Sequence, residues 1–200
     1  GAADQATEAL LAEMAEALLA DYPENASALG LDNGERSALR SKLTDRSPAG
    51  QQRLAERAAA RLAQLRAIDQ GRPGPAKRID VDVALTAHET AVEGFAFPFG
   101  DMAVLNQNWS YRNSPYAVAQ NVGAFVEIPD MLDSNHKVET AADADAYLAR
   151  LEAYAEALDG ETARLAHDAG LGVVAPAFLL DKTLGQMKPA RSQPIGQWTL

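Results

Sequence analysis

Apolar residues at helical spacing constrain this chain more than any other feature of its sequence. In residues 7–23, a series of apolar side chains recurs at this spacing and a proline follows them: Leu10, Leu11, Met14, Leu18, Leu19 and Pro23. The periodicity gathers the apolar side chains on one face of a helix, and the proline ends it. The segment is therefore predicted to be an amphipathic helix that packs against a core.

Most of the remaining chain follows the same pattern. Two short helical turns around a tight loop are expected in residues 25–43, and longer helices are predicted at residues 49–69, 79–94, 116–128, 140–170 and 175–187. Two Ser-Pro pairs, at 47–48 and 114–115, combine an N-cap residue with proline at the first helical position. Thr140 caps the longest helix, whose expected core stripe includes Leu148 and Leu165. Because no segment has a convincing strand period, the predicted class is all-α, a multi-helix array.

Composition narrows the possible partners. The 200 residues are 47% hydrophobic, which is enough for one domain with a core, and the net charge is −10 at pH 7. Nucleic acid and anionic membrane surfaces are poor partners, since both are bound mainly through clustered Lys and Arg. Cysteine is absent, which excludes disulfides and cysteine-ligated zinc. No apolar run approaches the roughly 18 residues of a membrane span, so no transmembrane segment is expected.

One helix begins like a zinc-protease motif and then departs from it. His88-Glu89 are the first two letters of H-E-x-x-H, in which histidines four residues apart hold zinc and the glutamate is the general base. The fifth position is Val92, which has no donor atom, and the position three residues after His88 is Ala91. His88 is therefore expected to be a hydrogen-bonded structural histidine or a residue that lines a pocket, without a metal.

Two further patterns are better explained by structure than by chemistry. Residues 170–175 match the dinucleotide fingerprint G-x-G-x-x-A, but they follow a predicted helix and not a strand, so Gly170 is interpreted as a left-handed C-terminal cap. Asp130, Asp133 and His136 are spaced by three and would make a weak hard-metal site on a helix. Pro129 suggests a frayed helix end instead, so these three residues are expected at the surface.

An amide-rich stretch keeps a functional interpretation. Residues 105–113 place side-chain amides around two aromatic residues in what should be an irregular connection: Asn106, Gln107, Asn108, Asn113, Trp109 and Tyr111. Amides that both donate and accept, beside aromatic surface, suit the binding of a peptide backbone. The alternative is an ordered loop whose amides bind its own backbone, and the residues alone do not decide between the two.

Three segments together resemble a known family. They are "YPENASALGL" at residues 22–31, "FPFGDMAVLNQ" at 97–107 and "GVVAPAFLLDKTLGQM" at 172–187. With the helices between them, they resemble the N-terminal region of the bacterial DUF885 family from about residue 8 to residue 188. Family members are longer, mostly exported or lipid-anchored, and similar in fold to zinc-dependent metallopeptidases, with the zinc-binding helix downstream of the region matched here.

The resemblance implies a domain plan and a function. Residues 1–188 would be a helical N-terminal domain, the N-terminal half of a gluzincin-like metallopeptidase fold, and residues 189–200 a proline-containing linker towards a C-terminal catalytic part. The chain would wall the substrate cleft of a zinc-dependent peptidase or amide hydrolase and be catalytically incomplete alone, with zinc held in the downstream part. Implied partners are that C-terminal remainder and a peptide-like substrate, and the implied location is the periplasm or outer surface, as an exported protein or lipoprotein.

The candidate pocket residues under this interpretation are the amide-rich loop and the broken zinc motif. They comprise Asn106, Gln107, Asn108, Trp109, Tyr111 and His88, with no catalytic and no metal-binding residue among them. A competing hypothesis is an autonomous helical binding or scaffold protein without catalytic activity. An apolar surface patch well above about 400 Å² would favour a domain that needs a partner, and a uniformly polar surface an autonomous one.

Overall fold

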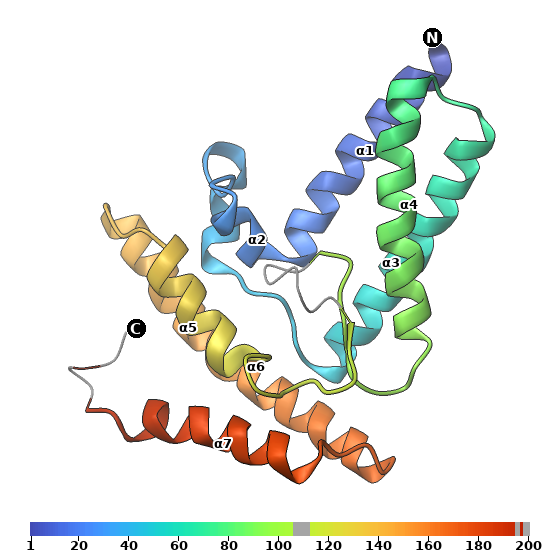
Figure 1. Cartoon of the computed structure of the whole chain (residues 1–200). Helices are drawn as coiled ribbons and strands as arrows, with labels where there is room; N and C mark the ends of the chain where they lie inside the picture. The colour runs from blue at the N-terminus through green and yellow to red at the C-terminus, as the bar shows by residue number, and fades with distance from the viewer. Residues whose placement is uncertain (106–112, 195–196, 198–200) are drawn as a thin grey trace.

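The computed structural model describes residues 1–105, 113–194 and 197, and these are mostly helical (Figure 1). The elements are α1 (Ala2–Asp21), α2 (Pro23–Ala28), the 3₁₀ helix η1 (Gly34–Ser41), α3 (Pro48–Gln70), α4 (Pro75–Phe95), β1 (Asp101–Met102), β2 (Asn113–Ser114), α5 (Ala124–Asn135), α6 (Ala141–Gly170) and α7 (Ala177–Ser192). This confirms the all-α prediction, with one small antiparallel pair, β1 with β2, that the sequence did not suggest.

Helices that have a complete N-terminal capping signal begin where the sequence predicted. Ser47 Oγ accepts a hydrogen bond from Gly50 N–H at 3.0 Å, and Pro48 occupies the first position of α3. Thr140 and Asp143 form a reciprocal capping box at the start of α6, which runs to Gly170 as expected. These signals are local, and the structure confirms both.

The second Ser-Pro pair does not start a helix, so the helix predicted for residues 116–128 is wrong over most of its length. Ser114 lies in β2, and its Oγ bonds to the backbone of Tyr116. Asn121 and Gly123 have φ values of 62° and 119°, which a helix does not allow, and α5 begins only at Ala124. The left-handed residues decide the local structure, and Ser-Pro alone does not.

Other boundaries also differ from expectation. Helix α4 begins at Pro75, four residues before the helix predicted for residues 79–94, because proline is well suited to the first helical position. Helix α5 continues through Pro129 to Asn135, where a frayed end was expected. Gly170 is not the left-handed cap; Gly172, with φ of 80°, has that conformation.

Two hydrophobic cores occupy different groups of helices. The first lies among α1, α3 and α4 and contains Tyr22, Leu54, Ala58, Ala91, Ala103 and Val104. The second lies between α5 and α6 and contains Ala124, Ile128, Met131, Leu132 and Ala157. In Figure 1, α5 and α6 lie side by side, apart from α1 and α4, with α2 between the two groups; α3 also contacts α6, and η1 packs on α6 and α2. The chain is therefore two packed groups of helices with a junction between them.

The stripe predicted for α6 is only partly correct. Tyr147, Leu151, Tyr154 and Leu158 pack against the second core, but Leu148 and Leu165 are exposed. The fully covered face of α6 carries small and charged residues instead: Arg150, Ala157, Gly160, Glu161, Arg164 and Asp168. This face points to the junction, where charges on α6 meet backbone from other segments.

Helix α7 packs less closely than the others. Thr183 is its one buried residue. The Gln186 side chain accepts from the backbone N–H of Asn121 through Oε1 and donates to Asn121 Oδ1 through Nε2. The helix continues to Ser192, past residue 189, where the linker was expected to begin. None of the described helices is long and apolar enough to cross a membrane.

Candidate functional site

Buried charges join the two groups of helices. Arg46, in the segment that precedes α3, donates from Nη2 to Glu127 Oε2 at 2.8 Å and from Nη1 to Glu161 Oε1 at 2.9 Å. Burial alone would lower the pKa of Arg46, but the two carboxylates outweigh it and raise that pKa. The Arg46 guanidinium therefore stays charged and connects the first group to α5 and α6.

Glu161 has a second role at the start of α5. Both of its carboxylate oxygens accept from the backbone N–H of Ala124, at 2.9 and 3.0 Å. A negative charge at a helix N-terminus satisfies free N–H groups and interacts favourably with the helix dipole. Burial raises the pKa of the Glu161 carboxyl, and its bonds to Arg46 and Ala124 oppose that shift.

Two residues one turn apart on α6 hold the Phe-Pro-Phe-Gly segment. Arg164 Nη2 donates to Gly100 O at 2.7 Å and to Asp101 Oδ1 at 2.6 Å, while Asp168 Oδ2 accepts from Gly100 N–H at 2.9 Å. Gly100 has φ of 85°, and a Cβ at this position would collide with the carbonyl oxygen of Ser114. Only glycine fits here, which gives the sequence "FPFGDM" a structural explanation.

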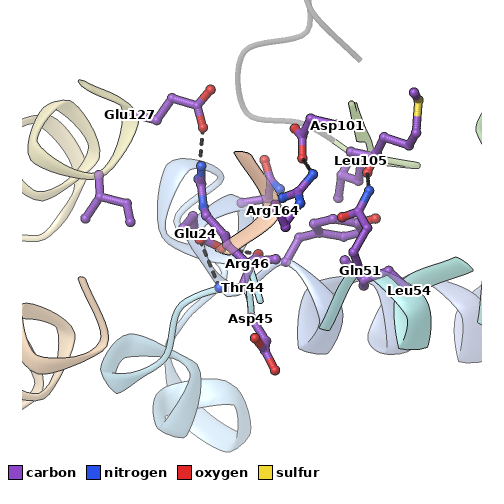
Figure 2. A pocket seen from close by; sticks show the side chains of 15 residues that line it. Glu24, Thr44, Asp45, Arg46, Gln51, Leu54, Asp101, Leu105, Glu127 and Arg164 are labelled. Carbon is purple, nitrogen blue, oxygen red and sulfur yellow. Dashed lines mark hydrogen bonds and ion pairs between the residues drawn. The ribbon is translucent and has the colours of Figure 1, made fainter. Parts of the chain in front are cut away.

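A small polar cavity lies at the centre of the junction, as Figure 2 shows. Its lining includes Arg46 and Arg164, together with Glu24, Thr44 and Asp101 (Figure 2). Its volume is about 60 Å³, which holds a few water molecules but no substrate group. Thr44 is fixed by Glu24, through its N–H at 2.9 Å and its hydroxyl at 2.7 Å. This cavity belongs to the charge network that joins the two groups.

A larger cavity of about 360 Å³ lies next to it. The two cavities share Gln51, Met102 and Arg164 as lining residues. The larger cavity is formed by the start of α3, the end of α4 with the segment after it, and the last turns of α6. Its apolar lining residues are Pro48, Ala55, Phe95, Phe97, Pro98, Phe99 and Met102. A concave apolar site of this size with a few polar groups at one end is typical of ligand binding. We call it the junction pocket.

The polar end of the junction pocket contains an oriented histidine. His167 Nδ1 lies 3.0 Å from Asp168 Oδ1, and Asp168 is itself buried. A carboxylate that accepts from Nδ1–H leaves Nε2 as an acceptor in the neutral ring. The residues that line the pocket, all in the described part of the chain, include no Ser, Thr or Cys to act as a nucleophile beside the imidazole. The arrangement therefore suits binding of a ligand more than nucleophilic catalysis.

His88 lies apart from these cavities, on the buried face of α4. It is 2% exposed, and its Nδ1 is 2.7 Å from Ala84 O, four residues earlier. Burial, and then the nearby positive charge of Arg61, lower the pKa of His88, and the bond to Ala84 opposes them. Its Nε2 has no hydrogen-bond partner in the described structure. This position favours the structural interpretation of His88 over the pocket one.

The residues of this chain do not fit a zinc ion. Among the described residues, no three His, Cys, Asp or Glu side chains are grouped to hold a metal, and residues 106–112, 195–196 and 198–200 contain none of these residue types. Zinc sites require three or four such ligands. We therefore derive no catalytic step through a metal from this chain.

The expectation that His136 is a surface residue is wrong, although Asp130 and Asp133 are exposed. His136 is buried, with Nε2 at 2.9 Å from Asp143 O and Nδ1 at 3.0 Å from Arg150 Nη1. Burial and then the positive charge of Arg150 lower the pKa of His136, and the bond to Asp143 O opposes them. The helix continues past Pro129 and brings His136 against α6, which sequence spacing alone did not indicate.

The amide-rich candidates Asn106, Gln107, Asn108, Trp109 and Tyr111 lie outside the described residues. Their role therefore stays a prediction. The described ends of this segment are Leu105, which lines the small polar cavity, and Asn113, whose amide donates to Thr90 O at 3.1 Å.

One pattern in the sequence could have indicated the buried residues of α6 that were not predicted as site residues. Arg150, Ala157, Glu161, Arg164 and Asp168 recur at intervals of seven, four, three and four, which places them on one face of α6. Charged residues at that spacing are normally interpreted as a solvated face. Here they are buried because each finds a partner in another segment.

Comparison with known proteins assigns the class of this helical chain. The family model described as "Bacterial protein of unknown function (DUF885)" matches residues 23–197. The match covers most of the chain, and the protein belongs to the DUF885 family. No curated protein and no solved structure matches it.

Proposed function

We propose that this chain forms part of the substrate-cleft wall of a zinc-dependent peptidase or amide hydrolase with a gluzincin-like helical fold, and that it is catalytically incomplete by itself. The observation that carries the proposal is the junction pocket, a concave apolar site with an oriented imidazole. The described residues that line it include no nucleophile beside the imidazole and no metal-ligand set. Such a site binds substrate while another part of the protein supplies the reacting groups.

The geometry of the pocket supports a role in a cleft. Its walls come from three separate segments, and the buried bonds of Arg164 and Asp168 to Gly100 hold two of these segments in a fixed relation. A binding wall must keep its shape to position a substrate to within a fraction of an ångström. A role in substrate contact is also proposed for the amide-rich loop residues: Asn106, Gln107, Asn108, Trp109 and Tyr111.

Exposed apolar side chains support a partner for this chain. On α4, Ile79 and Val83 are 65% and 67% exposed and line a shallow cavity with Thr86, Ala87 and Thr90. On α7, Phe178 is 65% exposed. Exposed apolar surface of this kind marks interaction sites. We infer that the catalytic part of the same protein, with its zinc, covers one of these faces, and that the whole is exported to the periplasm or held as an outer-surface lipoprotein.

The purified chain provides the test of catalytic incompleteness. After dialysis against zinc, the account expects substoichiometric zinc by atomic absorption and no hydrolysis of a mixed set of peptide and acyl-amide substrates. Zinc bound at one equivalent together with hydrolysis that a chelator abolishes would overturn the proposal.

A second candidate function, an autonomous helical binding or scaffold protein, is favoured by the same exposed residues on α4 and α7. The two functions differ in what the protein does once its partner is bound. Hydrolysis of a peptide by the complex supports the cleft-wall function, whereas a stable complex without hydrolytic activity supports the scaffold.

A further inference from the structure

We infer that the junction pocket binds a neutral ligand with an aromatic or bulky apolar body and a hydrogen-bond donor at its polar end, such as an aromatic residue of a peptide with its backbone N–H. This inference rests on the proposed function, because it names the substrate class that this wall of the cleft would select. It follows from the shape, the charge and the free hydrogen-bonding groups of the pocket.

The apolar part of the pocket is aromatic. Phe97 and Phe99 pack with ring centroids 5.7 Å apart at an interplanar angle of 51°, and Phe95 and Met102 add to the same wall. Tilted aromatic pairs leave ring faces and edges on which a third ring can stack, and methionine sulfur also contacts rings favourably. A volume of about 360 Å³ accommodates one large side chain with part of its backbone.

The charges that line the pocket cancel. Arg164 and Asp168 are its formally charged lining residues, one of each sign, when His167 is neutral. Both are already engaged, since Arg164 binds Asp101 and Gly100 O while the two oxygens of Asp168 bind His167 and Gly100 N–H. A charged ligand would lose its hydration here without gaining an unpaired counter-ion. The pocket therefore favours a neutral ligand.

Hydrogen-bond acceptors are among the polar groups that the pocket leaves for a ligand. In the neutral His167 ring, an Nδ1–H that donates to Asp168 leaves Nε2 as an acceptor. Gln51 and Gln52 each use one side-chain N–H, to donate to Met102 O and to Glu56 Oε1, and no described donor contacts their carbonyl oxygens. A ligand that donates an N–H or O–H at this end satisfies these groups, and a ligand that only accepts does not.

Three small probes with a common phenylethyl body separate these claims: 3-phenylpropanamide, its non-donating analogue methyl 3-phenylpropanoate, and the anion 3-phenylpropanoate. NMR titration of the purified chain is expected to show saturable shifts of the His167 imidazole with the amide, at a Kd on the order of 1 mM. The ester and the anion should each bind at least fivefold more weakly. Equal binding of all three, or no saturable binding of the amide, would overturn the inference.

Two pairs of variants locate the site. Ala55→Phe fills the pocket and should abolish amide binding, whereas Ala59→Phe, on the exposed part of the same helix, should leave it unchanged. His167→Phe keeps ring size but removes the acceptor and should weaken the amide at least fivefold; His167→Gln should restore part of that loss. Binding that survives Ala55→Phe or is indifferent to His167→Phe would contradict the assignment. These results concern binding only, so they are distinguishable from the outcome of the zinc and hydrolysis test.

Discussion

Replacement of Arg150 by methionine should destabilise the protein more than any single substitution on its surface. The side chain of Arg150 is 0% exposed and donates to Ser27 Oγ at 2.7 Å, to His136 Nδ1 at 3.0 Å, and to the carbonyls of Leu39 and Lys42 at 3.1 Å each. Burial lowers the pKa of Arg150 to about 10, so it is still protonated at neutral pH. One cation thus holds η1, α2 and the end of α5 on α6.

The expected loss of stability follows from the buried hydrogen-bond acceptors that lose their partner in Arg150→Met. Leu39 O keeps a bond from Lys42 N–H, and Ser27 Oγ keeps its bond to Asp32, so Lys42 O and His136 Nδ1 are the two groups that lose their described partner. Each unsatisfied buried group costs about 1–3 kcal/mol, and the relieved desolvation of the guanidinium offsets part of this cost. The expected loss is about 3 kcal/mol, or roughly 6–12 °C in Tm for a domain of this size.

Urea unfolding followed by circular dichroism measures this loss against a matched control. Arg66→Met removes an Arg that is 60% exposed and pairs with Glu89, and it should change the free energy of unfolding by less than about 0.5 kcal/mol. If Arg150→Met were as small in effect as Arg66→Met, the idea of Arg150 as the buried connection between segments would be refuted.

Two further predictions concern the same junction and its neighbourhood. A Cβ on Gly160 would lie 2.7 Å from Ser47 N and 2.9 Å from Arg46 C, both backbone atoms, so Gly160→Ala should cost about 1–3 kcal/mol in urea unfolding despite the better helix propensity of alanine. Gly185 in α7 has open space around it, so Gly185→Ala should be neutral or slightly stabilising. A larger loss of stability for Gly185→Ala than for Gly160→Ala would show that α6 and the segment before α3 are not in close contact. The pKa of His136 in the folded state is lowered below its ordinary 6.5, so the unfolded chain binds more protons than the folded one. The contribution of His136 to stability is therefore full above pH 6.5. It falls as pH decreases through the folded-state pKa, by at most about 1.4 kcal/mol per pH unit. His88 contributes in the same direction, and His136→Gln should flatten the slope between pH 7 and pH 5; an unchanged slope would contradict the assignment of His136 as a buried neutral group.

The sequence predicted those parts of the fold that local chemistry determines. The Thr140 capping box, Ser47-Pro48 and the apolar periodicity of α1 act within a few residues, and the structure has helices where they indicate. The start of α5 was missed because Ser-Pro also occurs in turns, and the left-handed Asn121 and Gly123 decide the path of the chain there. Such competition between local signals is resolved only by the packing of the whole.

The candidate site was harder to predict from the sequence than the fold was. Phe95, Phe97 and Phe99 line the junction pocket, although no sequence pattern singled them out as site residues. The charged face of α6 was not foreseen, because a buried Arg164 or Asp168 is stable only beside partners that lie more than sixty residues away in the chain. Spacing shows that such residues share a face, and tertiary contacts decide whether that face is buried.

Photo-crosslinking tests the central claim, that the junction pocket receives an aromatic residue of a peptide-like ligand, most directly. A short neutral peptide with a 4-benzoylphenylalanine residue would be irradiated with the purified chain, with and without excess 3-phenylpropanamide, and the adducts located by mass spectrometry. The account predicts adducts on Phe97, Met102 or Gln52 that the amide suppresses and that Ala55→Phe removes. Adducts confined to other surfaces, or adducts that neither the amide nor Ala55→Phe reduces, would contradict it.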